Sequence, residues 1–166
     1  MVQKSQTAGP ASADQPLRAH VLIIEARFYE GIADMLAEGA IAECAARGVS
    51  YERVVVPGAL EIPQAFAAAV AATVAGRKTF DGAIVLGCVI RGETAHYDIV
   101  CNNANHWTME TAVRQGVPVG NAILTVETEA QAIARAKGGR AGKGGDAARA
   151  CLQLIELKRG FWSGRA

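Results

Sequence analysis

The stretch "DGAIVLGCVIRGETAHYDIV", residues 81–100, changes character twice. It begins as an apolar run of strand length, which a polar loop from Arg91 to His96 follows. From His96 onward the apolar spacing is that of a helix. A continuously apolar strand that leads through a loop into a helix is typical of a parallel sheet covered on both faces. This stretch therefore predicts an α/β protein.

The same alternation of strand and helix patterns continues on both sides of this stretch. Strands are expected within residues 20–26, 51–58, 81–89 and 117–127, and helices within 31–48, 61–76, 96–116, from 128 onward and within 147–162. Residues 137–146, "KGGRAGKGGD", are expected to break the last two helices apart. Because the strands are apolar throughout, we predict a doubly wound, flavodoxin-like α/β fold, with a four-stranded parallel sheet flanked by helices on both faces.

Length and composition favour one domain behind a short tail. Residues 1–18 are rich in Ser, Ala, Gln and Pro and are expected to form a flexible tail, and residues 19–166 a single α/β domain. Hydrophobic residues make up 51% of the chain but aromatic residues only 5%. The core must therefore be built mainly from Ala, Val, Ile and Leu.

Charge and hydropathy exclude several classes of partner. The net charge of +1 gives no electrostatic reason to expect nucleic acid or an anionic membrane as a partner. The N-terminal segment has no apolar core of the kind found in signal peptides. No apolar run approaches the length of about 20 residues that a membrane span requires.

The cysteines predict buried thiols and no metal site. None of the four forms a CxxC pair or lies at zinc-ligand spacing from a histidine: Cys44, Cys88, Cys101 and Cys151. Each lies in an apolar or helical context, where a free cysteine behaves as a small hydrophobic residue. Reduced thiols in turn suggest a cytoplasmic protein.

Unusual residues gather where the expected strands end. They occupy residues 27–29, 57–61, 89–96 and 127–128. In open α/β sheets, ligands bind beyond the carboxyl ends of the strands. We therefore expect these four loops to converge on one edge of the sheet and to form a ligand site.

The loop after the third strand has the chemistry of an oxyanion site with a proton-transfer group beside it. Gly92 allows close approach of a ligand, and Thr94 adds a hydroxyl to the free N–H groups of a helix start. Glu93 would have to point away from a bound phosphate. The segment lacks P-loop and GxGxxG spacing, so ATP and dinucleotides are not expected. His96 suits proton transfer near neutral pH, although a structural capping role is the alternative.

The other candidate residues each have a functional and a structural interpretation. Phe28 could stack on a flat ring or belong to the core. Glu61 could accept hydrogen bonds from ligand hydroxyls or complement a helix dipole. Arg135 and Lys143 could bind an anion or be solvated charges near the Gly-rich break.

Six segments together resemble the lumazine synthase family: "RFYEGI", "VPGALEIPQA", "GCVIRGETAHYDIV", "GVPVGNAILTVE", "QAIARA" and "GKGGDAA". The resemblance runs from about His20 to Phe161. It implies an enzyme of riboflavin biosynthesis that condenses 5-amino-6-(D-ribitylamino)uracil with 3,4-dihydroxy-2-butanone 4-phosphate, releasing phosphate and water. It also implies no cofactor and no metal, two small-molecule substrates, and self-association into a homopentamer, with shells of sixty subunits in some members.

The resemblance also implies roles for individual residues. Phe28 would stack on the pyrimidine, and Glu61 would accept hydrogen bonds from the ribityl chain. His96 would transfer protons, while Thr94 and Arg135 would bind the phosphate, whose departure Arg135 would assist. The remaining implied substrate contacts are Ala59 and Leu60 to the ribityl chain, Val89 and Ile90 to the uracil ring, Glu93 in the phosphate loop, and Asn121 and Lys143.

The position of some of these residues implies a shared site. Asn121 lies inside the fourth expected strand, and Arg135 and Lys143 follow it in the chain. One small sheet has difficulty bringing them over the ends of its own first three strands. The resemblance implies that a neighbouring subunit supplies them.

Three other functions remain open at the level of the sequence. The chain could be a non-catalytic α/β module that binds a flavin or a phosphate, which would have no need of His96. It could be a hydrolase that uses Cys88 or Cys101, although neither lies on a turn typical of a nucleophile. It could also serve as a shell-forming or storage protein.

Overall fold

The computed structural model describes residues 15–164. These residues form one sheet of four parallel strands in the order β2-β1-β3-β4. The strands are β1 (His20–Ala26), β2 (Ser50–Val56), β3 (Gly82–Ile90) and β4 (Val119–Val126). Parallel neighbours require crossover connections, and each of the three crossovers contains a helix. The predicted doubly wound, flavodoxin-like fold is thereby confirmed.

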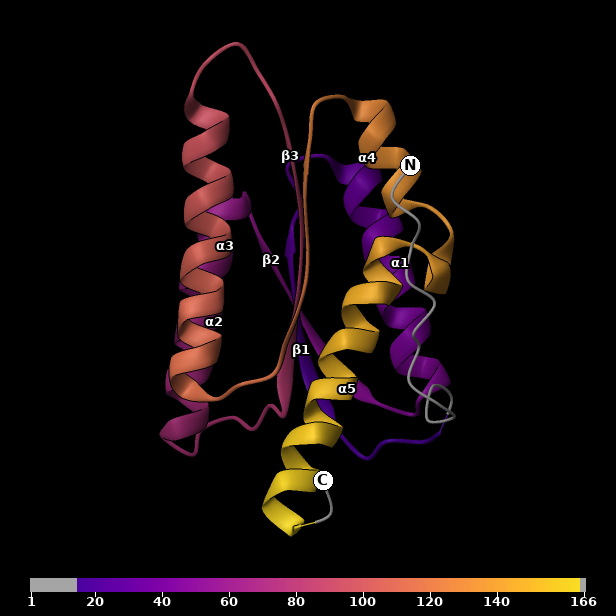
Figure 1. Cartoon of the computed structure of the whole chain (residues 1–166), viewed down its shortest axis with the longest axis vertical. Coiled ribbons are helices and arrows are strands. Elements are labelled where there is room, and N and C mark those ends of the chain that lie inside the picture. The colour runs from indigo at the N-terminus through magenta and orange to yellow at the C-terminus, as the bar shows by residue number, and fades with distance from the viewer. Residues whose placement is uncertain (1–14, 165–166) are drawn as a thin grey trace.

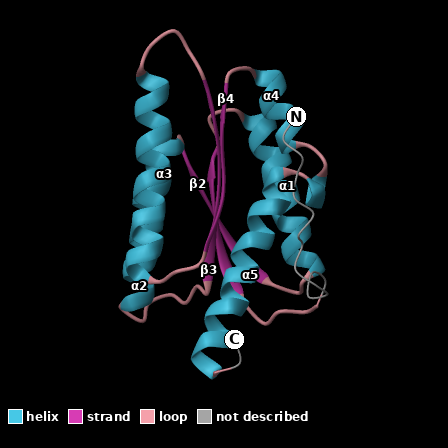
Figure 2. Cartoon of the chain, in the orientation of Figure 1, coloured by secondary structure: helices cyan, strands magenta, loops and turns pink. Residues whose placement is uncertain are grey.

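Helices cover the two faces of the sheet unequally. The helices α2 (Ile62–Val74) and α3 (His96–Gln115) pack on one face, and α1 (Glu30–Ala46), α4 (Glu129–Ala136) and α5 (Lys143–Ser163) lie on the other (Figures 1 and 2). Two short 3-10 turns, η1 (Ala59–Glu61) and η2 (Gly139–Ala141), precede α2 and α5. Among the described residues, no helix is both long enough and apolar enough to cross a bilayer.

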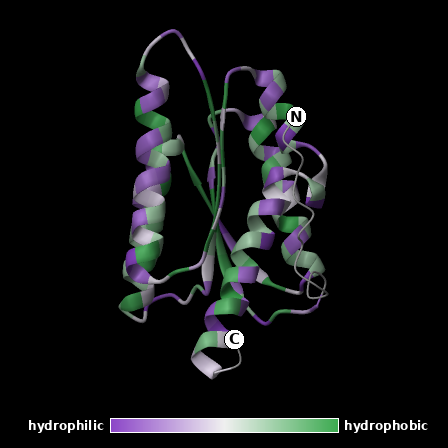
Figure 3. Cartoon of the chain, viewed as in Figure 1, coloured by the Kyte–Doolittle hydropathy of each residue, from purple (hydrophilic) through white to green (hydrophobic). Residues whose placement is uncertain are grey.

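The core consists of two layers that share the central strands. Val21 and Ile23 of β1 pack in the layer beneath α1 and α5, whereas Leu22 and Ile24 pack beneath α2 and α3. All four side chains are buried, since alternate residues of a strand point to opposite faces. Figure 3 shows the corresponding pattern, with hydrophobic residues along the strands and mixed residues on the amphipathic helices. β1 and β3 are thus fixed in the middle of the sheet.

Local signals in the sequence set several helix boundaries. The Thr128 hydroxyl accepts a hydrogen bond from the Gln131 amide at 3.3 Å, and the Gln131 side chain accepts one from the Glu127 amide at 2.9 Å. This is a variant of the capping box, with its second bond one residue earlier, and it explains why a helix begins here. Gly116, with φ of 62°, ends α3 in the left-handed conformation that glycine adopts most readily.

Two expectations about the elements are wrong. The strands are not all covered on both faces, because β2 is an edge strand and exposes Val54 and Val55. The Gly-rich break is also shorter than expected, because α5 begins at Lys143 and includes Gly144 and Gly145. A Cβ atom on Gly144 would lie only 1.9 Å from the Leu36 carbonyl oxygen, so this glycine serves close helix packing.

The expected N-terminal tail lies mostly outside the described residues. From Leu17 onward the chain is packed, because Leu17 is buried in the core layer beneath α1 and α5. Its amide donates a hydrogen bond to the Arg47 carbonyl oxygen at 2.8 Å. Contacts with the domain thus extend before residue 19, since the Gln15 carbonyl oxygen also accepts a hydrogen bond from Arg47 Nε.

Candidate active site

A cavity of about 410 Å³ lies at the carboxyl edge of the sheet. This volume falls within the range typical of small-molecule sites. Its lining comes from the ends of β1, β2 and β3 and from the start of α3: Phe28, Tyr29, Pro57, Gly58, Ala59, Leu60, Glu61, Cys88, Val89, Ile90, Gly92, Thr94, His96, Tyr97 and Val100. Three of the four expected loops therefore converge. The fourth loop, which follows β4, does not line the cavity. Its Glu127 pairs with Arg91.

The loop after β1 presents an aromatic ring to the cavity. Phe28 is 72% exposed, so it is not the core residue that one interpretation expected. Tyr29 packs edge-on against it, with ring centroids 5.0 Å apart and an angle of 70° between the ring planes. This contact leaves the Phe28 ring accessible for stacking on a flat ligand.

The loop after β2 supplies a carboxylate to the cavity. Ala59 is buried, whereas Leu60 and Glu61 are half-buried in the short turn η1. A Cβ atom on Gly58 would lie 3.1 Å from Glu61 Oε2, so the carboxylate oxygen lies close to the backbone of Gly58. Hydroxyl groups of a ligand in this part of the cavity would find an acceptor in Glu61.

The third wall of the cavity is the N-terminus of the 20-residue helix α3. The His96 amide donates to the Thr94 hydroxyl oxygen at 3.4 Å, and both residues line the cavity. Amide groups at such a helix start favour an oxyanion, and the Thr94 hydroxyl adds a donor. Glu93 is exposed and is not among the lining residues, which fits a side chain that points away from a bound anion.

The first turn of α3 is held by an arginine that the sequence did not single out for this purpose. The Arg91 guanidinium lies 4.1 Å from the centre of the Tyr97 ring and pairs with Asp98 and Glu127. Burial raises the pKa of Tyr97, and it likewise raises the pKa of Tyr29. Both phenols therefore remain neutral hydrogen-bonding groups at physiological pH.

Three lining residues lie outside the loops expected from the sequence: Cys88, Tyr97 and Val100. Tyr97 has a simple signal, because it directly follows the candidate residue His96 in the chain. Cys88 and Val100 read as ordinary core residues, and both are in fact largely buried.

The thiols of this region are poor nucleophiles. Burial raises the pKa of Cys88 to about 11, and the neighbouring Cys101 contributes a smaller increase. Burial also raises the pKa of Cys101. Because the thiolate is the reactive form, a protonated thiol at neutral pH argues against the cysteine hydrolase alternative. Cys44 and Cys151 are fully buried in the core, as predicted.

The remaining candidates, Asn121, Arg135 and Lys143, do not line this cavity. Asn121 pairs in register with Val85, three positions before Leu124, which pairs with the lining residue Cys88. Three residues of strand correspond to about 10 Å, so Asn121 lies well before the carboxyl ends of β3 and β4, where the cavity is. Its side-chain amide donates to Asn105 of α3 at 2.8 Å.

Arg135 and Lys143 lie in the helical layer opposite α3 (Figure 1). The Arg135 guanidinium donates to the Gln131 carbonyl oxygen at 3.0 Å, and the Lys143 ammonium pairs with Asp146 at 3.1 Å. Both side chains are exposed on the surface of the chain. The described chain therefore assembles the first group of candidate residues but not this second group.

Comparison with known proteins places the chain in a family. The profile of the 6,7-dimethyl-8-ribityllumazine synthase family matches residues 18–159. A protein of that name from Nitrobacter hamburgensis is 52% identical over 141 residues, which cover 85% of this chain and 86% of the relative. One from Azorhizobium caulinodans is 48% identical over 150 residues, covering 90% and 93%. A match of this extent spans the whole sheet and every loop of the cavity, and the chain therefore belongs to the 6,7-dimethyl-8-ribityllumazine synthase family.

Proposed function

We propose that this chain condenses 5-amino-6-(D-ribitylamino)uracil with 3,4-dihydroxy-2-butanone 4-phosphate, releasing phosphate and water. The observation that carries the proposal is the cavity at the carboxyl edge of the sheet. An accessible aromatic ring, a carboxylate, a helix N-terminus with a hydroxyl, and a histidine all line it. Family membership supports the same reaction.

The uracil substrate fits the side of the cavity formed by β1, β2 and β3. Its ring would stack on Phe28, beside the backbone of Val89 and Ile90 at the end of β3. The ribityl chain would lie along Ala59 and Leu60, with Glu61 accepting hydrogen bonds from its hydroxyls. These contacts are the ones that a flat ring with a polyol tail requires.

The phosphate substrate fits the α3 side of the cavity. Its phosphate would accept hydrogen bonds from the first amides of α3 and from the Thr94 hydroxyl. His96 lies beside this position, where the reacting carbonyl would be held. Arg135 would add a charge-assisted contact that strengthens as phosphate leaves.

The chemistry requires positioning and proton transfer. The substrate amine attacks the ketone, the imine forms as water leaves, and phosphate departs. The ribitylamino nitrogen then attacks the remaining carbonyl carbon, and the ring closes with loss of a second water. Each step moves a proton, which His96 could accept and return. Holding two reactants in register supplies a large part of the rate enhancement in reactions of this kind.

The proposed reaction is tested by mixing the purified chain with both substrates. We expect the absorbance and fluorescence of the lumazine product to appear far faster than in the same mixture without protein. The control omits one substrate at a time. Tight binding of either substrate without any acceleration would instead indicate the non-catalytic binding module.

We also propose that the active form is a homopentamer, alone or within a sixty-subunit shell, and that each site draws residues from two neighbours. The position of Asn121, Arg135 and Lys143 outside the cavity supports a shared site. An exposed apolar surface near the ends of α3 and α5, which includes Val113, Phe161 and Trp162, supports association. Native mass spectrometry distinguishes monomer, pentamer and shell by mass.

A cytoplasmic location belongs to the same proposal. All four cysteines are free. Free thiols persist in reducing compartments such as the cytosol.

Replacing Phe28 with alanine is expected to weaken binding of the uracil substrate more than binding of the phosphate substrate. Aromatic stacking contributes about 0.5–1.5 kcal/mol beyond the burial of area. Isothermal titration with each substrate measures the difference. Equal losses for both substrates, or a large drop in melting temperature, would mean that the ring serves packing.

Replacing Arg135 with alanine is expected to raise the KM for the phosphate substrate and to weaken inhibition by inorganic phosphate. A charge-assisted hydrogen bond of this kind is worth about 1.5–3 kcal/mol. The matched control is Lys137→Ala, which removes an exposed cation just beyond α4. Unchanged phosphate affinity in Arg135→Ala would show that Arg135 is a solvated helix charge.

A further inference from the structure

A carboxylate is buried where α1 meets the start of α5. Glu43 is 0% exposed, and its Oε2 atom accepts hydrogen bonds from Arg140 Nε at 2.9 Å and from Arg149 Nη2 at 3.0 Å. Its Oε1 atom is buried without a hydrogen-bond partner among the described residues. Burying a charge in this way is costly, so the ion pair is weak evidence for a purely stabilising role.

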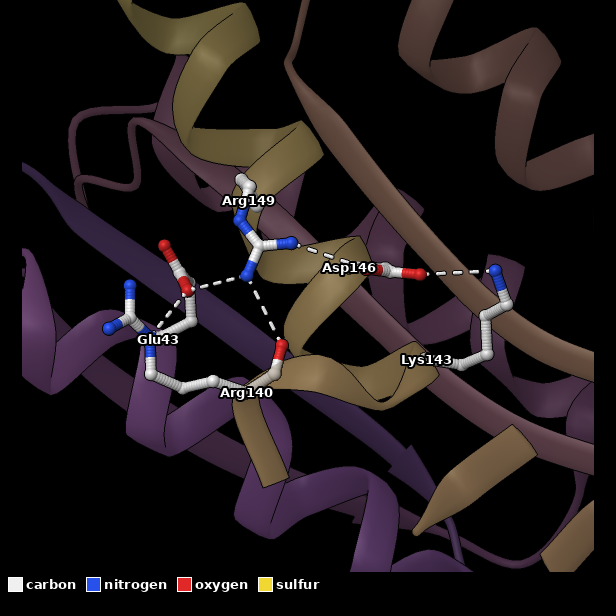
Figure 4. Close-up of polar contacts among 5 residues, drawn as sticks. All are labelled: Glu43, Arg140, Lys143, Asp146 and Arg149. Atoms are coloured by element: carbon white, nitrogen blue, oxygen red, sulfur yellow. Dashed lines mark hydrogen bonds and ion pairs between the residues drawn. The ribbon is translucent and has the colours of Figure 1, made fainter. Parts of the chain in front are cut away.

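The two arginines connect Glu43 to the beginning of α5. The same nitrogen of Arg149 that contacts Glu43 also donates to the Arg140 carbonyl oxygen at 3.1 Å. Its other terminal nitrogen, Nη1, donates to Asp146 Oδ1 at 3.2 Å. Asp146 Oδ2 then accepts a hydrogen bond from Lys143 Nζ at 3.1 Å. Figure 4 shows this series of contacts running from Glu43 through Arg149 and Asp146 to Lys143.

The series leads from the interior of the chain to its surface. Glu43 is fully buried, Asp146 and Arg149 are partly exposed, and Lys143 is exposed. The backbone around it leaves little freedom, because a Cβ atom on Gly145 would lie 2.1 Å from the Arg140 carbonyl oxygen. A Cβ atom on Gly39 of α1 would lie 2.6 Å from the Gly139 carbonyl oxygen. The buried end is therefore anchored, and Lys143 is the end that can meet a ligand.

We propose that Glu43 is a positioning residue for Lys143, acting through Arg149 and Asp146. The inference rests on the proposed function, in which Lys143 contacts a substrate. Glu43 holds Nη2 of the Arg149 guanidinium, while Nη1 contacts Oδ1 of Asp146. The other carboxylate oxygen of Asp146, Oδ2, contacts Lys143. A lysine held in this way loses less conformational entropy when it binds a ligand.

Loss of the Glu43 charge should free the Lys143 side chain from its contact with Asp146. A guanidinium freed from Glu43 can bind both carboxylate oxygens of Asp146 in the bidentate geometry that arginine favours. Lys143 then loses its partner and samples other rotamers. The variant Glu43→Gln removes the charge at nearly constant side-chain volume.

The test is a double-mutant cycle between Glu43→Gln and Lys143→Ala in the full-length protein, with kcat/KM as the readout. We expect Glu43→Gln to lower kcat/KM about tenfold in the otherwise unchanged chain and to have almost no effect in the Lys143→Ala background. Asp146→Asn breaks the same connection at Lys143 while leaving Arg140 and Arg149 on Glu43. It should reproduce this pattern, and it serves as the second variant if Glu43→Gln does not fold.

The matched control is Glu156→Gln. It breaks the other ion pair between the C-terminal end of α1 and α5, in which buried Arg47 contacts Glu156 at 2.6 Å. That pair is not part of the series that ends at Lys143. We expect Glu156→Gln to lower the melting temperature but to leave kcat/KM within about twofold of the starting value.

The outcomes separate this inference from the proposed function. Equal losses from Glu43→Gln in both backgrounds, or an equal loss from Glu156→Gln, would overturn the positioning role, because a general loosening of α1 against α5 would produce them. An undiminished kcat/KM in Lys143→Ala alone would show that Lys143 contacts no substrate. That result would overturn the role of Lys143 in the proposed function and leave Glu43 with nothing to position.

Discussion

Replacing His96 with alanine is expected to slow turnover by about 10²- to 10⁴-fold, the usual contribution of a general acid–base group. His96 lines the cavity beside the Thr94 hydroxyl, at the start of α3, where the phosphate substrate is proposed to lie. Substrate binding should remain nearly intact, because the phosphate contacts come from amides, Thr94 and Arg135. Water can carry out part of the proton transfer when the imidazole is missing, so the smallest expected loss of turnover is about 10²-fold.

The measurement is kcat across neutral pH, together with the affinity for each substrate by titration. The matched control is His106→Ala, which removes an exposed histidine from the same helix, away from the cavity. His106→Ala should keep both kcat and substrate affinity. A His96→Ala variant that ran at the original rate at every pH would exclude a role in proton transfer and leave the structural capping role.

Coexpression of His96→Ala and Arg135→Ala chains is expected to restore much of the activity that each variant lacks alone. In a ring of head-to-tail contacts, one subunit would supply His96 and its neighbour Arg135 to each site. With equal and random mixing, about a quarter of the sites would then combine an unchanged His96 with an unchanged Arg135. Measured with the phosphate substrate well below its KM, activity per site should rise to about a quarter of the original value, at least an order of magnitude above the His96→Ala rings.

The control for this experiment is each variant expressed separately and shown by light scattering to form particles of the normal size. Mass spectrometry must also show that the coexpressed rings contain both chains. If well-mixed rings showed only the average activity of the two variants, each site would lie within a single chain, and the shared-site proposal would fail.

The fold was predictable because its signals are local. Apolar runs marked the four strands, the Thr128 and Gln131 pair marked the start of α4, and Gly116 marked the end of α3. Each signal acts over a few residues, through hydrogen bonds or backbone conformation that the residues themselves favour. Parallel pairing then follows from the alternation of strands with helices.

The errors in the predicted elements come from contacts between distant parts of the chain. The apolar run at residues 54–56 does not reveal that β2 lies at the edge of the sheet, since strand order depends on the crossovers. Gly144 and Gly145 suggested a break in the helix. In the structure they are inside α5, because only glycine lets the start of α5 approach the backbone of α1 and η2.

One part of the cavity lining was predictable from the chain alone. Phe28, Glu61, Thr94 and His96 each follow a strand, and parallel strands bring their carboxyl ends to the same edge of the sheet. The position of Asn121, Arg135 and Lys143 outside this cavity became clear from the folded chain. The folded chain also pairs Glu43 with Arg149 across 106 residues. Such a pairing depends on how α1 packs against α5, and no periodicity or spacing within either helix specifies it.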